Sequence, residues 1–425
     1  MFENLIAQEA VAAGLAEAVR EAALPPALLF SGPPASGKLT AALELARVLS
    51  CTGSRTWNCP CPHCAQHRLL THGDLLLFGK RSLPEEIGVA RNLLAQYPGQ
   101  TSAYFFARAA RKLLARFNPV LWAGEETKLG KVLPLVQSIQ DSLDQLRPEI
   151  AGTTLSDPEI KAADSVVADC QTLEASCPEQ PGVFMIRNME VWAQLAPTSS
   201  RKTVVIENAD RMQDSARNAM LKILEEPPET VRFVLLTSRR ASMMATILSR
   251  SRIFNFVPRD EDASRAVASR VFKSREAVPS LQEFFESKMP FPPSEAIREA
   301  RRFIGCLLAP KVAQGAAFGP LAATMAEEAA ASKATARAIL AGIVEETGGF
   351  GARDKSMAGS FLRFARALLS VFASLLGESS GNPGTLALID EWSRLVREAA
   401  IQYSSLNRNP ELLAEVLADS FGDLP

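Results

Sequence analysis

The chain has 425 residues, of which 47% are hydrophobic and 22% are charged, and its formal net charge at neutral pH is −1. This composition is typical of a folded globular protein and excludes an intrinsically disordered chain. The balanced charge excludes a globally basic nucleic-acid binder, so any contact with DNA has to come from a local patch. A chain of this length is expected to form about two to four domains.

The N-terminus and the cysteines indicate the compartment. Residues 1–14, MFENLIAQEAVAAG, lack the basic start and the long apolar run of a signal peptide. Uninterrupted apolar runs in the chain stay well short of the roughly 20 residues that span a bilayer. We therefore expect a cytoplasmic protein without a membrane partner. In that reducing compartment the seven cysteines favour metal binding over disulfides.

A glycine-rich loop follows the first apolar run, Ala27–Phe30. The sequence GPPASGK at residues 32–38 stands between this expected strand and a helical pattern that continues to about Leu49. Such a loop binds phosphates, because its glycines expose backbone N–H groups, the helix N-terminus adds positive charge, and Lys38 reaches the β- and γ-phosphates. The predicted nucleotide contacts are Gly32, Ser36, Gly37, Lys38, Leu39 and Thr40.

The position after Lys38 limits what this loop does. A Ser or Thr hydroxyl normally ligates Mg²⁺ there, but Leu39 has no ligand atom. Thr40 comes one residue later, which on a helix is about 100° further round the axis. We therefore predict weak binding of ATP or ADP with impaired Mg²⁺ coordination.

Four cysteines, Cys51, Cys59, Cys61 and Cys64, lie within a segment of fourteen residues. Four soft thiolate ligands suit a closed tetrahedral site for structural Zn²⁺. His63 lies within the same segment and stays open as a replacement for one thiol. The role expected for the metal is scaffolding.

Residues 201–256 hold two further buried strands, Lys202–Ile206 and Phe233–Leu236, separated by an amphipathic helix at Ala216–Leu224. Acidic residues end the first strand, and the hydroxyl of Thr237 ends the second. Continuous apolar runs of this kind are typical of a parallel sheet covered on both faces. In such sheets ligands bind at the carboxyl ends of the strands.

The sequence LKILEEPPE at Leu221–Glu229, followed by Leu248-Ser249-Arg250, resembles the bacterial DNA polymerase III clamp-loader family of AAA+ proteins. The resemblance covers about residues 1–95 and 183–260, and the acidic loop is more similar to the delta-prime branch than to the gamma/tau branch. It implies an α/β AAA+ P-loop domain with a zinc module, a small helical lid and an all-α collar. The implied AAA+ domain spans residues 1–257 and includes the zinc module at 51–64 and a helical insertion at about 95–180. The implied lid spans residues 258–290, and the implied collar spans residues 291–425.

The resemblance also implies roles for single residues. Motor ATPases of this class end the acidic strand with an Asp-Glu pair, and the matching residues are Glu207 and Asn208. Glu207 would assist a metal, whereas the amide of Asn208 is no general base. Thr237 matches the position that senses the γ-phosphate. Leu39 and Asn208 affect the same function, so we expect the chain's own ATPase activity to be absent or weak.

Ser249 and Arg250 match a motif whose arginine reaches the ATP of a neighbouring subunit, an arginine finger in trans. The leading hypothesis is therefore a delta-prime-like stator that assembles with gamma/tau and delta subunits and helps load the sliding clamp onto primed DNA. One alternative is a gamma/tau-type subunit that hydrolyses its own ATP. Another is a structural or DNA-binding module with an inactive nucleotide fold outside replication.

The remaining segments are predicted to be helical. In the expected insertion the patterns fall at Phe105–Phe117, Lys131–Leu146 and Ile160–Leu173. The first of these carries Arg108, Arg111, Lys112 and Arg116, for which a solvated face is favoured over a contact with DNA or an acidic partner. Beyond residue 290 the patterns fall at Ile297–Leu308, Leu321–Glu345, Ser360–Leu376 and Leu386–Ile401, with Pro310 as a break.

Overall fold

The computed structural model describes residues 1–79, 84–148, 155–178, 180–272, 274, 280–287, 291–315, 318–332, 335–346, 360–378, 383–406 and 410–422. The chain divides into two compact units, Met1–Phe285 and Glu286–Pro425. Each unit is described by itself. Within the described residues, none of the helices combines the length and the apolar character needed to cross a membrane.

A five-stranded sheet forms the centre of the first unit, with the strand order β2-β3-β4-β1-β5. All of its neighbouring strands pair in parallel. The strands are β1 (Ala27–Ser31), β2 (Leu75–Phe78), β3 (Lys202–Ile206), β4 (Val231–Thr237) and β5 (Arg252–Asn255). The expected α/β fold with a parallel sheet is thereby confirmed.

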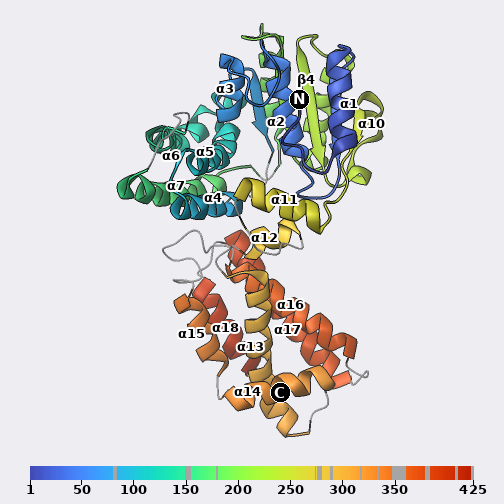
Figure 1. Cartoon of the computed structure of the whole chain (residues 1–425). Helices are drawn as coiled ribbons and strands as arrows, with labels where there is room; N and C mark the ends of the chain where they lie inside the picture. Colours follow the sequence, from blue (N-terminus) through green and yellow to red (C-terminus); the bar gives the residue numbers. More distant parts are fainter. Residues whose placement is uncertain are drawn as a thin grey trace. The chain divides into compact units, whose positions relative to one another are not determined.

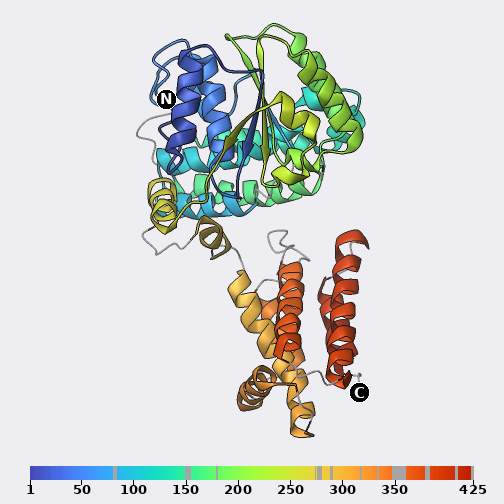
Figure 2. The ribbon, with the colours of Figure 1, turned by 90° about the vertical axis from the view of Figure 1, so that its right-hand side faces the viewer.

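Helices cover both faces of this sheet, as Figure 2 shows. Alternate strand residues enter two different cores, because successive side chains of a strand point to opposite faces. Leu28 and Phe30 of β1 pack in one core together with α1 (Glu9–Arg20) and α2 (Lys38–Ser50). Leu29 packs in the other core, which includes residues of α8 (Val183–Gln194) and α9 (Asp214–Glu225). Burial on both faces explains the apolar runs in strands β1 to β4, whose residues are all buried.

The parallel order brings three loops to one edge of the sheet. β1 lies between β4 and β5, and β3 lies between β2 and β4. The carboxyl ends of β1, β3 and β4 are therefore neighbours, and residues 32–38, 207–210 and 237–239 follow them. These three loops therefore lie at the edge of the sheet where the sequence predicts a ligand site.

A layer of helices is inserted between β2 and α8 (Figure 1). Its first helix begins at Pro84. Its core residues, such as Phe106 and Phe117, join the same cluster as Phe78 and Ile206 of the sheet. Its elements are α4 (Pro84–Gln96), α5 (Gln100–Leu114), η1 (Ala115–Phe117), η2 (Pro119–Trp122), α6 (Glu126–Gln145) and α7 (Asp157–Ala175).

The prediction of a solvated basic face on α5 and η1 is wrong for two of its four residues. Arg111 is 5% exposed and Arg116 is 2% exposed. Arg111 pairs with Asp144 of α6 at 2.7 Å, and Arg116 is engaged at the sheet edge described below. Lys112 pairs with Glu86 of α4. Positive charge on this helix therefore holds the inserted layer together.

Two helices follow the sheet, α11 (Glu261–Phe272) and α12 (Leu281–Ser287). Val267 and Ala268 of α11 form a small core with Val89 of α4 and with Phe284. The expected lid segment thus packs on the inserted helices in the first unit.

The second unit is helical in its described residues. Its helices are α13 (Pro293–Ala313), α14 (Pro320–Ser332), α15 (Ala336–Glu346), α16 (Ser360–Glu378), α17 (Pro383–Leu406) and α18 (Pro410–Gly422). A core around Trp392, Phe364 and Phe303 holds them together. Contrary to expectation, α13 continues through Pro310. This proline lies in the last turn of α13, where it removes a single hydrogen bond close to the helix end.

Candidate nucleotide and metal sites

The phosphate loop connects β1 to α2 in the expected position. Gly37 has a φ of +99°, a backbone conformation that favours glycine. A Cβ atom on Gly32 would lie 2.5 Å from the carbonyl oxygen of Phe256, so that only glycine fits there. Lys38 Nζ donates to the carbonyl oxygens of Gly32 at 2.6 Å and Pro33 at 2.5 Å. The lysine is thus folded onto its own loop.

The residues after Lys38 do not form a metal site. Leu39 is 6% exposed and packs in the core beneath the loop. Thr40 is half-buried one position further along α2. Mg²⁺ requires oxygen ligands in octahedral geometry. The residues present at the start of α2 therefore do not fit a magnesium ion.

Glu207, which directly follows β3, is paired with an arginine of the inserted layer. Its side chain is 7% exposed and accepts a hydrogen bond from Arg116 Nη2. Arg116 Nε donates to the carbonyl oxygen of Gly79 at 2.9 Å, which fixes the guanidinium at the sheet edge. A cation of the protein itself therefore neutralises the carboxylate that was expected to assist a metal.

The loop after Glu207 links two strand ends. Asn208 adopts a left-handed conformation with a φ of +49°. This turn leads to Asp210, which is 8% exposed and accepts a hydrogen bond from Thr237 Oγ1 at 2.7 Å. Thr237 also accepts from the backbone N–H of Arg239 at 2.9 Å. The sequence-predicted sensor residue is thus engaged at the strand end with Asp210.

A second arginine lies over the phosphate loop. Arg259 donates to the carbonyl oxygens of Ala35 in the loop and of Ile6 near the N-terminus. Burial lowers the pKa of its guanidinium. Gln8 and Val257 exchange two hydrogen bonds, of 2.8 and 3.0 Å, beside it. The N-terminal segment, the loop and the chain after β5 are therefore tied together.

Arg250 lies at the surface, away from the buried contacts of the loop. It ends α10 (Ala245–Arg250), and its side chain is 34% exposed. Its Nη2 donates to Glu225 Oε1 of α9 at 2.9 Å, and Nη1 donates to the carbonyl oxygen of Thr246 at 3.1 Å. Ser249 Oγ donates to the same carbonyl. These contacts aim the guanidinium without burying it.

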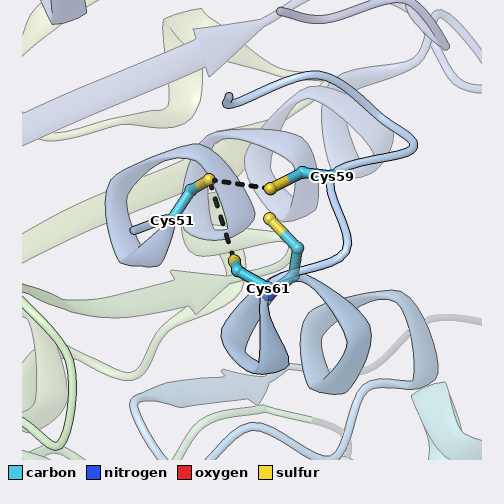
Figure 3. A group of neighbouring side chains, drawn as sticks. Cys51, Cys59 and Cys61 are labelled. Atoms are coloured by element: carbon cyan, nitrogen blue, oxygen red, sulfur yellow. Dashed lines mark hydrogen bonds between the residues drawn. The ribbon is translucent and has the colours of Figure 1, made fainter. Parts of the chain in front are cut away.

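The four predicted cysteines converge. The sulfur atoms of Cys51, Cys59, Cys61 and Cys64 all lie within 4.8 Å of one another. Figure 3 shows Cys51 facing Cys59 and Cys61, at S–S distances of 3.6 and 3.9 Å. Tetrahedral zinc with bonds of about 2.3 Å separates its sulfur ligands by about 3.8 Å. The arrangement therefore fits a structural Zn²⁺ ion, which would cross-link the loop.

Local hydrogen bonds favour thiolates at part of this cluster. The backbone N–H of Cys61, together with donors from Ser54, lowers the pKa of Cys59 to about 5. The pKa of Cys61 is also lowered, because backbone donors outweigh the effect of burial. Burial instead raises the pKa of Cys64. His63 is not part of the metal-binding group; its Nδ1 lies 2.9 Å from Nε2 of His72.

The sequence identified the loop and the cysteines, but it did not identify the arginines. Arg116 belonged to an expected surface helix, and Arg259 to the start of the expected lid. Their partners are distant in the chain, 91 residues away for Arg116 and Glu207 and 224 residues away for Arg259 and Ala35. The local sequence around these arginines carries no signal for such contacts.

Part of the chain that holds these residues is similar to known proteins. Residues 163–260 match the family model described as DNA polymerase III, delta subunit. The delta-prime subunit of Haemophilus influenzae DNA polymerase III is 38% identical over 99 residues, which are 23% of this chain and 29% of that protein. The tau subunit of Bacillus subtilis is 32% identical over 102 residues, 24% of this chain and 18% of that protein.

A replication factor C subunit shows a similar match. Replication factor C small subunit 1 of Pyrobaculum arsenaticum is 31% identical over 90 residues, which are 20% of this chain and 27% of that protein. The matched segments thus span less than a third of the length of each of these relatives.

Proposed function

We propose that this chain belongs to the clamp-loader family and works as a delta-prime-like stator of the DNA polymerase III clamp loader. In this role it assembles with gamma/tau and delta subunits in the cytoplasm and helps to load the sliding clamp onto primed DNA. We assign residues 1–257 to the AAA+ domain, 258–290 to the lid and 291–425 to the collar.

The buried pair of Arg116 and Glu207 carries the proposal. A motor ATPase needs a carboxylate that is available to Mg²⁺ and its attacking water. In this chain the guanidinium of Arg116 occupies that carboxylate in a site that excludes solvent. Leu39 supplies no hydroxyl, and Asn208 supplies no general base. We therefore propose that the chain's own ATPase activity is absent or weak, and that ATP or ADP binds without full Mg²⁺ coordination.

The position of Arg250 supports a role in trans. An arginine finger has to reach a phosphate on another subunit, and its charge must not be neutralised in the interior. Arg250 stays one-third exposed at the end of α10, oriented by Glu225. We propose Arg250 as the finger, with Ser249 shaping the end of the helix.

A gamma/tau-type ATPase is the second candidate. It is favoured by Lys38, which stands at the lysine position of the phosphate loop, and by the similarity to the Bacillus subtilis tau subunit. Its Mg²⁺ site would require Glu207 to leave Arg116.

A reconstituted loader distinguishes the two candidates. Clamp- and DNA-stimulated ATP turnover is measured with wild type, Lys38→Ala and Arg250→Ala chains. The stator predicts that Arg250→Ala lowers turnover by about 10³-fold or more at the site it serves, and that Lys38→Ala leaves turnover near wild type. Arg265→Ala, which removes an exposed arginine of α11, is the control. A large loss in Lys38→Ala would instead identify an ATPase that hydrolyses its own nucleotide.

A further inference from the structure

Arg47, in α2, contacts the cysteine loop, which we define as residues 51–64. Its side chain is 1% exposed, and its Nη1 donates to Cys64 Sγ at 3.4 Å and to the carbonyl oxygen of Thr56 at 2.7 Å. Its Nη2 donates to the carbonyl oxygen of Arg55 at 3.2 Å. One buried guanidinium therefore contacts both a sulfur atom of the cluster and the backbone that carries the other cysteines.

The charge of Arg47 suits a loaded site. Four thiolates around one divalent cation carry a net charge of about −2, which is costly in a buried position. A positive donor to one sulfur reduces this cost and orients the ligand. Glu44, which is itself buried, pairs with Arg47 at 2.9 Å and holds the guanidinium in place. Although burial disfavours the charged form, the Glu44 carboxylate and Cys64 outweigh it and raise the pKa of Arg47.

The contacts continue from Glu44 to α11. Asn4 Nδ2 donates to Glu44 Oε1 at 2.9 Å. Arg270 of α11 donates to Asn4 Oδ1 at 3.4 Å and to the carbonyl oxygen of Glu3 at 3.2 Å. These residues all belong to the first unit. An unbroken series of polar contacts thus connects the cysteine loop, α2, the N-terminal segment and α11.

We propose that Arg47 is the positioning residue of the four-cysteine metal site and that it couples metal loading to the anchoring of α11. A bound metal fixes the thiols, and the fixed loop holds the guanidinium against Glu44. When the metal leaves, Arg47 loses a fixed partner on the loop side. The support that Glu44 and Asn4 give to Arg270 then weakens.

Metal affinity tests the positioning role. Zn²⁺ competition with a chromophoric chelator is measured for wild type and Arg47→Gln, and the Co²⁺ absorption spectrum reports the thiolate geometry. We expect Arg47→Gln to bind Zn²⁺ about 10–100-fold more weakly, with an altered Co²⁺ spectrum. Arg232→Gln is the control for loss of a buried arginine, since Arg232 contacts backbone carbonyls of β4 and of the turn before it.

Arg47→Lys keeps the positive charge but loses the forked contacts of the guanidinium, so we expect it to bind Zn²⁺ with an affinity between those of wild type and Arg47→Gln. This variant replaces Arg47→Gln in the test if Arg47→Gln does not fold. Wild-type affinity and spectrum in a folded variant at Arg47 would overturn the positioning role.

Hydrogen exchange tests the coupling. In the wild type, removal of the metal with a chelator is expected to increase amide exchange in residues 261–272. Asn4→Ala leaves every contact of Arg47 with the loop in place, so its Zn²⁺ affinity falls only by the factor by which metal loading changes exchange in α11, because the coupling is reciprocal. Exchange in α11 of this variant is already high and changes little on chelation. An equal response of wild type and Asn4→Ala, or no response of the wild type, would overturn the coupling; α9 is the internal control.

Discussion

Arg116 and Glu207 form a buried ion pair, with side chains 2% and 7% exposed, at the carboxyl end of strand β3. The arginine comes from the inserted helices and the glutamate from the sheet. The carbonyl oxygen of Gly79, just after β2, accepts a further hydrogen bond from the same guanidinium. The inserted layer therefore supplies the positive charge at this edge, and it makes the sheet depend on the insertion.

We predict that Arg116→Leu destabilises the first unit by about 3–5 kcal/mol, because it leaves the Glu207 carboxylate without this buried partner. Urea denaturation followed by circular dichroism measures the loss. The double variant Arg116→Leu/Glu207→Leu should recover much of it, since neither charge then remains. If the double variant were as unstable as the single one, the cost would lie in packing and not in the unpaired charge. Arg265→Leu, which breaks an exposed pair, should have little effect.

Gly79 is expected to tolerate no side chain. Its φ is +99°, and an added Cβ would lie 2.2 Å from the carbonyl oxygen of Glu207. Backbone strain alone should make Gly79→Ala less stable by about 1–3 kcal/mol. The clash of the added Cβ with the carbonyl oxygen of Glu207 should lower the stability further. Gly88→Ala on α4 is the matched control, because open space surrounds that position and the helix gains up to about 1 kcal/mol. Thermal denaturation of both variants compares the two effects, and equal melting temperatures would contradict the prediction.

The metal site is predicted to use the four thiols without His63. Cys59→Ser and Cys64→Ser should lose bound metal, whereas His63→Ala should retain one ion per chain. Cys170→Ser, which changes a buried cysteine outside the cluster, should also retain it. Elemental analysis of the purified variants gives the stoichiometry. Loss of the metal from His63→Ala would place the histidine among the ligands.

His67 is predicted to make the protein less stable in acid. Burial lowers its pKa to about 2, and neither ring nitrogen has a hydrogen-bond partner among the described residues. Below about pH 6.5 the unfolded chain binds a proton that the folded chain does not bind. Folding stability should therefore fall by about 1.4 kcal/mol per pH unit in this range because of this residue.

The variant His67→Phe keeps the ring that stacks on His72 and removes the titrating group. Urea unfolding at pH 7.5 and pH 5.5, at equal metal content, should show a smaller acid loss for His67→Phe than for the wild type. Equal losses in the two proteins would show that another group causes the acid sensitivity.

Local sequence determined three strands of the sheet, the phosphate loop and the cysteine cluster of this protein. Runs such as Val204–Ile206 form buried parallel strands because continuous apolar side chains need cover on both faces. Gly32 and Lys38 fixed the loop, and Leu39 already indicated the missing metal ligand. These conclusions needed only neighbouring residues.

Tertiary structure decided which charges act at the site. A single arginine on a helix or in a linker is ordinarily expected to be exposed to solvent. This expectation applies to Arg116, Arg259 and Arg47. Their guanidinium groups are held in place because the fold brings carboxylates, carbonyl oxygens or a thiol against them. The free energy of a buried charge depends on the partners that surround it in three dimensions, and the sequence near each arginine does not specify those partners.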